Sequence, residues 1–176
     1  MAVPPSDSGA PRHAGAGDMF LAVNGARAGA INGESQDSKH KNEIEVLAWS
    51  WGMQGKPSLG GGGATGKATI RELRITKRVD KASTALMSAL RTNEPIKLAT
   101  LTIRKVGKTP LEYLIIKIED GRIMSLDIEA GDAANAPGML ERLTFSFNKI
   151  TVDYTPQGPD GSALGSTSFS DEWTAG

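Results

Sequence analysis

The sequence predicts a mainly β protein, an antiparallel β-barrel with one short α-helix at about residues 83–92 and a long glycine-rich loop. Three observations predict this fold class. Apolar residues recur with period two in many segments, one segment has helical spacing, and strands do not alternate regularly with helices. Many short strands with one helix are typical of a barrel or a sandwich. We favour a barrel because closure removes exposed strand edges.

Most of the predicted strands show alternating apolar residues, whereas the one over residues 111–118 carries apolar residues on both faces. The predicted strands cover residues 18–24, 47–53, 69–79, 96–103, 111–118, 123–130 and 143–154. One face of the second strand carries only large apolar side chains, which are those of Leu47, Trp49, Trp51 and Met53. This grouping favours a buried stripe or a subunit contact.

Two local features indicate how these strands are connected. The dipeptide Asp120-Gly121 has the chemistry of a hairpin turn, because glycine tolerates positive φ. In the last strand, the apolar positions change from odd to even numbers across Asn148-Lys149. One inserted residue produces such a change, so we expect a β-bulge there.

The predicted helix rests on a single segment. Leu86, Met87 and Leu90 recur at helical spacing, and Ser83 has the side chain of an N-cap. Pro95 follows shortly after, where a helix cannot continue. We therefore expect one short helix over about residues 83–92.

The composition sets bounds on the class of protein. A chain of 176 residues suffices for one domain with a core, and its 20 basic and 20 acidic residues give no net attraction to nucleic acid or anionic membranes. No apolar run approaches the roughly 20 residues of a membrane helix, so we expect no direct membrane insertion. The first residues lack the apolar centre of a signal peptide, which predicts a cytoplasmic protein whose export, if any, uses the folded form.

The chain divides into a body and two ends. Residues 1–17 are rich in Pro, Gly, Ala and Ser, which predicts a disordered N-terminal arm. Residues 18–156 form the predicted barrel domain, and residues 157–176 form a C-terminal tail. Phe169 and Trp173 are large enough to attach that tail to the body.

The glycine run nearly matches a phosphate-binding loop. The segment from Gly61 to Gly66 and Lys67 fits the pattern, but Ala68 stands where a hydroxyl would hold magnesium. The following residues indicate a strand, whereas a phosphate loop opens a helix. We therefore expect a flexible loop, with no nucleotide and no other cofactor.

The other candidate catalytic or metal-binding residues are few. The chain has no cysteine and two histidines, His13 in the predicted arm and His40 in a charged segment that we expect to be solvated. Glu43 and Glu45 share one strand face, where carboxylates are usually hydrated. The sequence thus predicts no catalytic residue, no metal site and no enzyme.

A nucleic-acid-binding barrel is the main alternative. Its face would combine Trp49 and Trp51, which can stack on bases, with nearby basic residues. Those basic residues are Lys67, Arg71, Arg74, Lys77, Arg78, Arg104 and Lys105. The balanced charge and the apolar neighbours of the tryptophans argue against it, so we expect no nucleic-acid partner.

A series of collinear motifs resembles the haemolysin-coregulated protein family over about residues 18–157. The motifs are Asp18-Met-Phe, Ile31-Asn-Gly-Glu-Ser35, Ile44-Glu-Val-Leu-Ala-Trp-Ser-Trp-Gly-Met53, the glycine run with Gly66-Lys67, Thr76-Lys77, Val79-Asp80-Lys81, Leu101-Thr-Ile-Arg-Lys105, Glu112-Tyr-Leu-Ile-Ile116 and Val152-Asp-Tyr-Thr-Pro-Gln157.

The resemblance implies a structural role in bacterial type VI secretion. Members of this family are tube subunits, each a β-barrel with one side helix. Six copies form a ring, and rings stack into a hollow tube that carries small effector proteins. The partners so implied are a spike protein, a contractile sheath and those effectors. The resemblance also implies a cytoplasmic location before firing and secretion, without a signal peptide, afterwards.

The resemblance further implies that the glycine-rich loop helps one ring contact the next. The residues concerned are the glycines of this segment, Gly52, Gly55, Gly60, Gly61, Gly62, Gly63 and Gly66. Glycine loses the most conformational entropy on ordering, so a loop ordered only by a neighbouring ring would keep stacking weak and reversible.

Overall fold

The computed structural model describes residues 17–55, 68–105, 107, 109–130 and 138–173. The predicted arm up to residue 16 lies outside these ranges. So do Gly60, Gly61, Gly62, Gly63 and Gly66 of the predicted stacking loop, together with Lys67.

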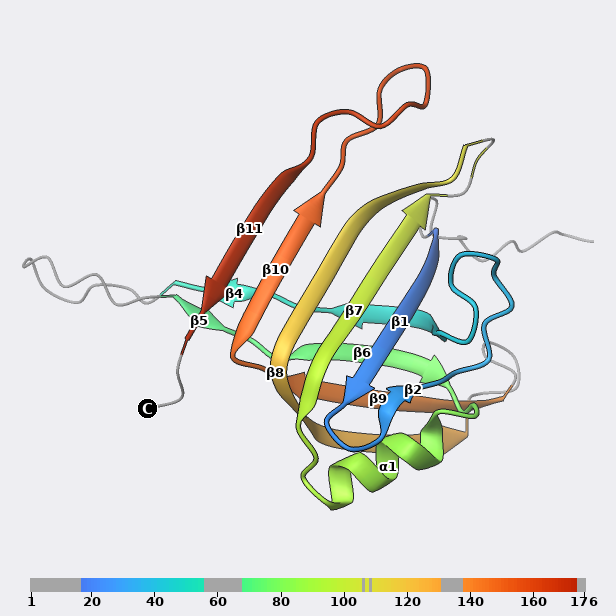
Figure 1. Cartoon of the computed structure of the whole chain (residues 1–176), viewed down its shortest axis with the longest axis vertical. Coiled ribbons are helices and arrows are strands. Elements are labelled where there is room, and N and C mark those ends of the chain that lie inside the picture. The colour runs from blue at the N-terminus through green and yellow to red at the C-terminus, as the bar shows by residue number, and fades with distance from the viewer. Residues whose placement is uncertain (1–16, 56–67, 106, 108, 131–137, 174–176) are drawn as a thin grey trace, which may run out of the picture.

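Six antiparallel strands close into a barrel, which confirms the predicted fold class. Around the barrel, they follow the order β1 (Asp18–Gly25), β3 (Ile44–Ser50), β6 (Leu73–Arg78), β9 (Met139–Ser146), β8 (Leu111–Ala130) and β7 (Ile96–Lys105). In Figure 1, β1, β7 and the first half of β8 cross in front of β3, β6 and β9. The barrel closes because β8 bends and pairs with β7 in its first half and with β9 in its second.

Large aliphatic and aromatic side chains fill the barrel. Leu21, Leu101, Ile116 and Phe145 are among the fully buried groups, and they come from four different strands. Burying each such side chain contributes roughly 1.5–3 kcal/mol, so this core supplies most of the drive for folding.

Helix α1 (Ser83–Arg91) lies across the lower end of the barrel in Figure 1, as the sequence predicted. Leu86 and Ala89 face the core, whereas Met87 is 36% exposed, so the inward face is narrower than expected. The predicted N-cap is wrong: Ala82 is the N-cap, and Ser83 is the first helical residue. The hydroxyl of Ser83 is engaged elsewhere, in a contact with Glu141.

No hairpin turn occurs at Asp120-Gly121, because β8 runs through this dipeptide as one strand of 20 residues. Asp120 has φ 56°, which bends the strand without ending it. A Cβ on Gly121 would lie 2.7 Å from the carbonyl oxygen of Ser146. The glycine therefore permits close approach of two strands, and the hairpin prediction is wrong.

The predicted β-bulge at Asn148-Lys149 is also wrong. The chain leaves β9 at Ser146 and resumes as β10 (Lys149–Tyr154), which pairs with the first half of β8. Both Phe147 and Ile150 are buried, since the chain turns the barrel corner between them. The change of the apolar positions from odd to even numbers thus reflects the bend between β9 and β10, which follows the bend of β8.

Strand β3 does contain an irregularity that the sequence did not indicate. Its register with β6 shifts between Val46 and Ala48, so the inward positions change from Ile44 and Val46 to Trp49. Leu47 is consequently 38% exposed and does not share the inner face with Trp49. The predicted buried stripe is therefore wrong at Leu47 and at Met53, which is 48% exposed, whereas the alternative of a subunit contact stays a prediction.

Short strands extend the barrel. β2 (Gly29–Ile31) pairs with β1, and β11 (Thr167–Glu172) pairs with β10 within the segment predicted as a tail. The strand predicted over 69–79 is divided into β5 (Thr69–Ile70) and β6. β5 pairs only with β4 (Met53–Gln54), and together they make a two-stranded arm. No helix of the described chain is long and apolar enough to cross a membrane.

Candidate functional site

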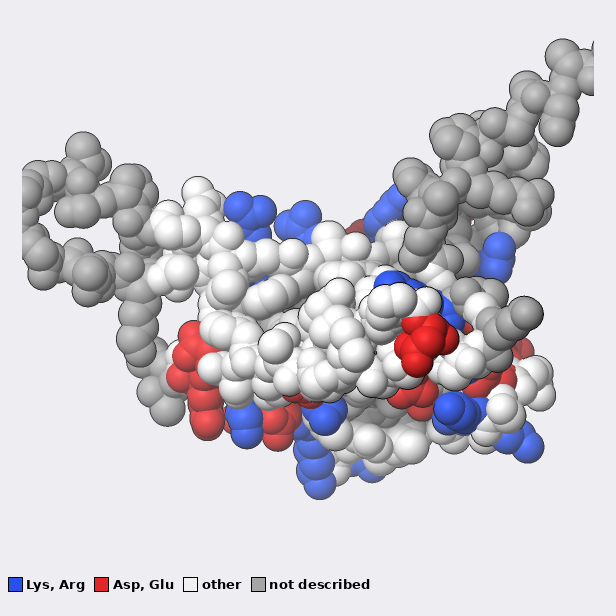
Figure 2. Space-filling view, turned by 90° about the horizontal axis from the view of Figure 1, so that it is seen from above, with Lys and Arg blue, Asp and Glu red and all other residues white. Residues whose placement is uncertain are grey.

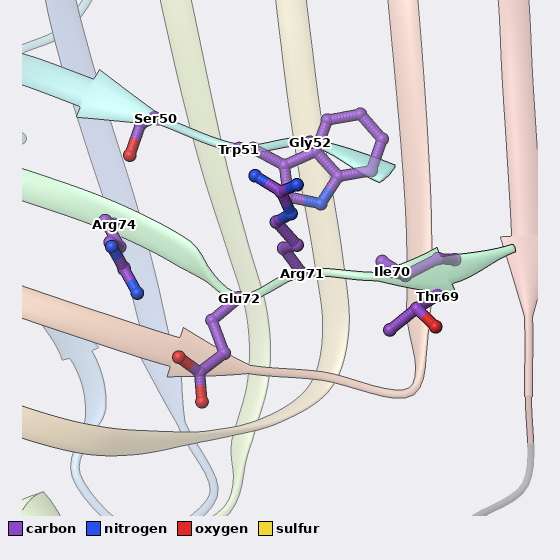
Figure 3. A pocket seen from close by; sticks show the side chains of 8 residues that line it. All are labelled: Ser50, Trp51, Gly52, Thr69, Ile70, Arg71, Glu72 and Arg74. Carbon is purple, nitrogen blue, oxygen red and sulfur yellow. The ribbon is translucent and has the colours of Figure 1, made fainter. Parts of the chain in front are cut away.

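A hollow of about 540 Å³ lies at the base of the arm, where the chain passes between the barrel and β4–β5. Figure 3 shows its lining residues, which are Ser50, Trp51, Gly52, Thr69, Ile70, Arg71, Glu72 and Arg74. A backbone hydrogen bond joins the two chain segments that line the hollow: Arg71 N donates to Gly52 O at 2.9 Å. The Arg71 guanidinium also donates to Gln54 Oε1 at 3.2 Å. These bonds fix the direction in which the arm leaves the barrel.

Two predicted stacking-loop residues, Gly52 and Gly55, lie in this arm region. A Cβ built on either of them would meet nothing within 4 Å. Packing within the chain therefore does not require glycine at these positions. The structure places them beside the arm but does not by itself assign them a role.

Trp51 packs against the core with its ring in the wall of this hollow. Among the side chains that the structure describes, its Nε1 is buried without a hydrogen-bond partner. Trp49 likewise packs against the core and pairs across to Ile75. Half-buried tryptophans that support the barrel wall are poorly placed to act as a stacking platform for bases.

A second hollow, of about 580 Å³, separates the arm from the end of β11. Its lining includes Met53 and Ile70 of the arm and Asp171 and Trp173 at the other side. Trp173 in turn packs on Phe147 with ring centroids 5.6 Å apart. The arm and the C-terminal strand therefore form two walls of one largely apolar groove.

The sheet extension next to this groove is only partly covered. Tyr154 of β10 is 44% exposed and Phe169 of β11 is 41% exposed. Phe169 lies opposite Val152 in the register, so these side chains share the face that continues the inner side of the sheet. β11 pairs with β10 alone, which leaves its outer edge open among the described strands. Open edges and exposed aromatics are features of surfaces that associate.

Two of the basic residues proposed for nucleic-acid binding, Lys77 and Arg104, are engaged in ion pairs within the chain. Lys77 has no exposed surface, and its ammonium group pairs with Asp80 at 2.8 Å and with Glu141 at 3.2 Å. Arg104 is bound to Asp37 at 2.6 Å and to Asp18 at 2.8 Å. On the face seen in Figure 2, uncharged side chains cover most of the centre, Lys and Arg lie along the upper border, and both signs of charge are interspersed along the lower border. The nucleic-acid interpretation thus loses two of its charges.

The sequence suggested that His40 is a solvated loop residue, and this prediction is wrong. It is 7% exposed and its ring stacks on Phe20 with centroids 4.3 Å apart. Its two ring nitrogens contact carboxylates of Glu43 and Glu112. Glu45, by contrast, is exposed and has no part in this contact. No local pattern indicates this arrangement, because Glu112 is 72 positions from His40 along the chain.

Asp37 and Glu94 are among the carboxylates whose pKa values lie below their ordinary range. The Arg104 guanidinium and the Lys39 amide donate to Asp37, and they hold the pKa of that carboxyl well below its usual 3.8. The Ala28 and Arg27 amides, which donate to Glu94 at 2.7 and 2.6 Å, lower the pKa of Glu94. Both carboxylates stabilise the fold, since their hydrogen bonds end on loop backbone or on another side chain. No group of three or more His, Asp or Glu within the described ranges could hold a metal ion.

These surfaces and the fold define the class of protein: a closed antiparallel β-barrel with one helix, an extended sheet and a projecting two-stranded arm. The model of a family described as "Type VI secretion system effector, Hcp" matches residues 20–154. A curated relative, protein hcp1 of Pseudomonas aeruginosa, is 39% identical over 151 residues, which are 84% of this chain and 89% of the relative. The chain therefore belongs to the Hcp family, whose members are secreted proteins of the type VI secretion system.

Solved structures agree with this assignment. A type VI secretion system effector from Yersinia pestis is 34% identical, with a TM-score of 0.69 over 89% of this chain and 100% of its own. A second structure, described as a type six secretion system protein, is 28% identical, with a TM-score of 0.76 over 86% of this chain and 92% of its own. Hcp1 from Salmonella typhimurium is 29% identical, with a TM-score of 0.67 over 86% and 93%.

Proposed function

We propose that this chain is the tube subunit of a type VI secretion system. Six copies form a ring, rings stack into a hollow tube, and small effector proteins occupy the lumen. The tube lies inside a contractile sheath and ends at a spike protein, and the subunit is cytoplasmic before firing and secreted afterwards. Membership of the Hcp family supports this function, which is structural and needs no catalytic residue.

The observation that carries the proposal is the incompletely covered sheet extension. The open edge of β11 and the exposed rings of Tyr154 and Phe169 leave apolar surface and unpaired backbone groups in water. A neighbouring subunit that packed against this face would bury both. Burial of this exposed apolar surface therefore contributes favourable free energy to assembly.

A closed ring also needs a second, different surface for the next subunit, because its contacts are heterologous. The chain offers exposed apolar groups at the other side of the barrel, where Val79 N donates to Met139 O at 3.0 Å. Val79 is 37% exposed, Met139 53% and Ile128 38%. Figure 1 places β11 and the start of β9 on opposite sides of the molecule. Two separated apolar surfaces suit head-to-tail association.

The arm supports the proposed contact between rings. β4 and β5 carry the chain away from the barrel toward Gly60, Gly61, Gly62, Gly63 and Gly66, which lie outside the described residues. Gly52 and Gly55 flank the start of the arm and leave open space around their Cα atoms. Their freedom suits a segment that takes its final conformation only against the neighbouring ring.

Particle shape and mass test the proposal directly. Electron micrographs of the purified full-length protein should show rings with a central hole, and light scattering should give six times the chain mass of 18.5 kDa. Phe169→Asp should shift the protein toward monomers by placing a charge on the sheet extension. Met124→Asp alters a side chain that is 53% exposed on another part of the surface and should leave rings intact.

Each outcome has a defined meaning. A strictly monomeric native protein at high concentration would contradict ring formation. Loss of rings in both variants would mean that the β10–β11 face has no special part in assembly. Rings that persist in Phe169→Asp would remove the sheet extension as the subunit contact.

A further inference from the structure

The imidazole of His40 lies between two carboxylates. Its Nδ1 is 3.0 Å from Glu43 Oε2, and its Nε2 is 3.1 Å from Glu112 Oε1. The side chain of His40 is 8% exposed, and its ring is nearly parallel to that of Phe20, at 9°. Stacking and burial hold the ring in the plane in which both nitrogens meet an oxygen.

The number of hydrogens needed for both contacts of the imidazole determines the charge that the cluster requires. A carboxylate oxygen only accepts, and a neutral imidazole carries hydrogen on one nitrogen. Both contacts are hydrogen bonds only if the three side chains of His40, Glu43 and Glu112 share one proton more than a neutral ring with two carboxylates. Without that proton, a nitrogen lone pair faces a carboxylate oxygen across about 3 Å, which is repulsive.

The cluster closes the loop of residues 32–43, which joins β2 to β3. Backbone bonds shape the loop internally, with Gly33 N donating to Asn42 O and Ser35 N to Glu43 O. Besides the stack of His40 on Phe20, polar side-chain contacts within the described chain tie the loop to the body in three places. These are His40 with Glu112 of β8, Asp37 with Arg104 of β7, and Glu34 with the amide of Lys81 before α1.

The charged groups around His40 determine how its protonation affects the loop. The groups facing it are Glu43 beside β3, Glu112 on β8 and, through the stacked ring of Phe20 on β1, Arg104 on β7. Arg104 is already committed to Asp37 and Asp18. The flanking Lys39 and Lys41 are exposed, and the ammonium of Lys105 lies over the ring of Tyr113, next to Glu112. His40 is therefore the buried group that bridges the two glutamates, whose own side chains are 25% and 33% exposed.

We propose that the loop of residues 32–43 is a proton-operated clasp, closed onto β8 when the His40–Glu43–Glu112 cluster holds its extra proton and released when that proton leaves. The contact with Glu43 spans three residues of the same loop and survives opening. The contact with Glu112 joins the loop to a strand 72 positions away, so repulsion between His40 and Glu112 moves the loop away from β8. Release removes the ring of His40 from that of Phe20 on β1.

The tie between Asp37 and Arg104 does not depend on the same proton. It persists throughout the neutral and alkaline range, since the pKa of Asp37 lies below its ordinary value. When the cluster loses its extra proton, the loop consequently opens from the β8 side and stays anchored at β7. This is a local opening that leaves the barrel folded, and it is independent of whether the subunits form rings.

Hydrogen exchange of the loop and the ring nitrogens of His40 together test the clasp. In the full-length His13→Gln protein, the nitrogen spectrum reports His40 alone, because the chain has two histidines. Both ring nitrogens should carry hydrogen while the loop is closed. Once the ring becomes neutral, amide exchange of residues 35–43, corrected for intrinsic rates, should rise by up to about tenfold per pH unit. The amide of Thr92, which donates to Ser88 O in the helix, is the internal reference.

Glu112→Gln is the matched variant. Its amide can accept from an N–H or donate to a lone pair, so its contact with His40 needs no extra proton. The pH dependence of loop exchange should disappear while the loop stays closed. A neutral His40 ring in a loop that still resists exchange would overturn the proposal. So would the same pH dependence in Glu112→Gln as in its parent.

Discussion

Lys77 Nζ lies 3.2 Å from Glu141 Oε2, and neither side chain has any exposed surface. Lys77 belongs to β6 and Glu141 to the neighbouring β9. The ammonium also contacts Asp80 at 2.8 Å and the hydroxyl of Ser83 at 3.1 Å, while that hydroxyl donates to Glu141 at 2.5 Å. The wall of the barrel is thus joined to the first residue of α1 by a buried charge cluster.

Replacing Lys77 with Met should destabilise the fold strongly. The substitution keeps most of the side-chain volume but leaves the Glu141 carboxylate buried without its cation. Breaking one partner of a buried pair costs about 3–5 kcal/mol. The free energy of unfolding, measured by urea titration, should fall by that amount with little change in the slope against urea.

The double variant Lys77→Met with Glu141→Leu is the control for this prediction. It removes both charges of the pair and should be more stable than Lys77→Met alone, because no unpaired carboxylate remains in the core. A cost below about 1 kcal/mol for the single substitution would contradict the dependence of the buried Glu141 carboxylate on Lys77.

Gly121→Ala should loosen the corner of the barrel. A Cβ there would lie 2.7 Å from the backbone oxygen of Ser146, and neither strand can move without breaking the closed sheet. Overpacking of this kind costs about 1–3 kcal/mol. Gly165→Ala is the control, since a Cβ at that position meets nothing within 4 Å. Equal midpoints of thermal unfolding for the two variants would show that the strands tolerate the methyl group.

Acid should destabilise the protein through Glu94 and Asp37. The folded state lowers the pKa of both, so their stabilisation is fully present above the ordinary values of 4.5 and 3.8. It is lost as the pH falls through the lower values of the folded state, where the two carboxylates take up protons. Urea midpoints measured from about pH 7 to about pH 3 should therefore decrease with falling pH. Glu94→Gln should be less stable at neutral pH and should show a shallower decrease. A parallel curve for this variant would exclude Glu94 as a source of the acid dependence.

The barrel and its helix could be predicted from the sequence because local patterns encode them. Alternating apolar residues located β1 and β7, and the spacing that includes Leu86 located α1. The errors arose where a distant segment determines the local conformation. β8 continues through Asp120-Gly121 because β9 and β10 pair along both of its halves, which no local pattern reveals.

The polar contacts could not be predicted for the same reason. Lys77 resembles any exposed strand lysine until Glu141, 64 positions away, is placed beside it. His40 resembles a loop residue until Glu112 meets its ring. The glycines were also misjudged. The sequence drew attention to the glycine-rich segment and treated Gly121 only as part of a turn. In the structure, Gly121 permits the close approach of two strands.

Substitution of Gly52 and Gly55 by alanine should separate the stability of the subunit from the stacking of rings. Neither glycine has positive φ, and a Cβ at either position has open space, so the double variant should fold and be more stable by roughly 0.4–1 kcal/mol per site. Rings should still form, because the sheet extension is untouched. Stacks seen in micrographs at high protein concentration should become shorter, since the arm can no longer adapt freely to the next ring. Gly165→Ala, which is equally unhindered but lies outside the arm, should stack like the native protein. Unchanged stack lengths in the double variant would remove Gly52 and Gly55 from the ring contact.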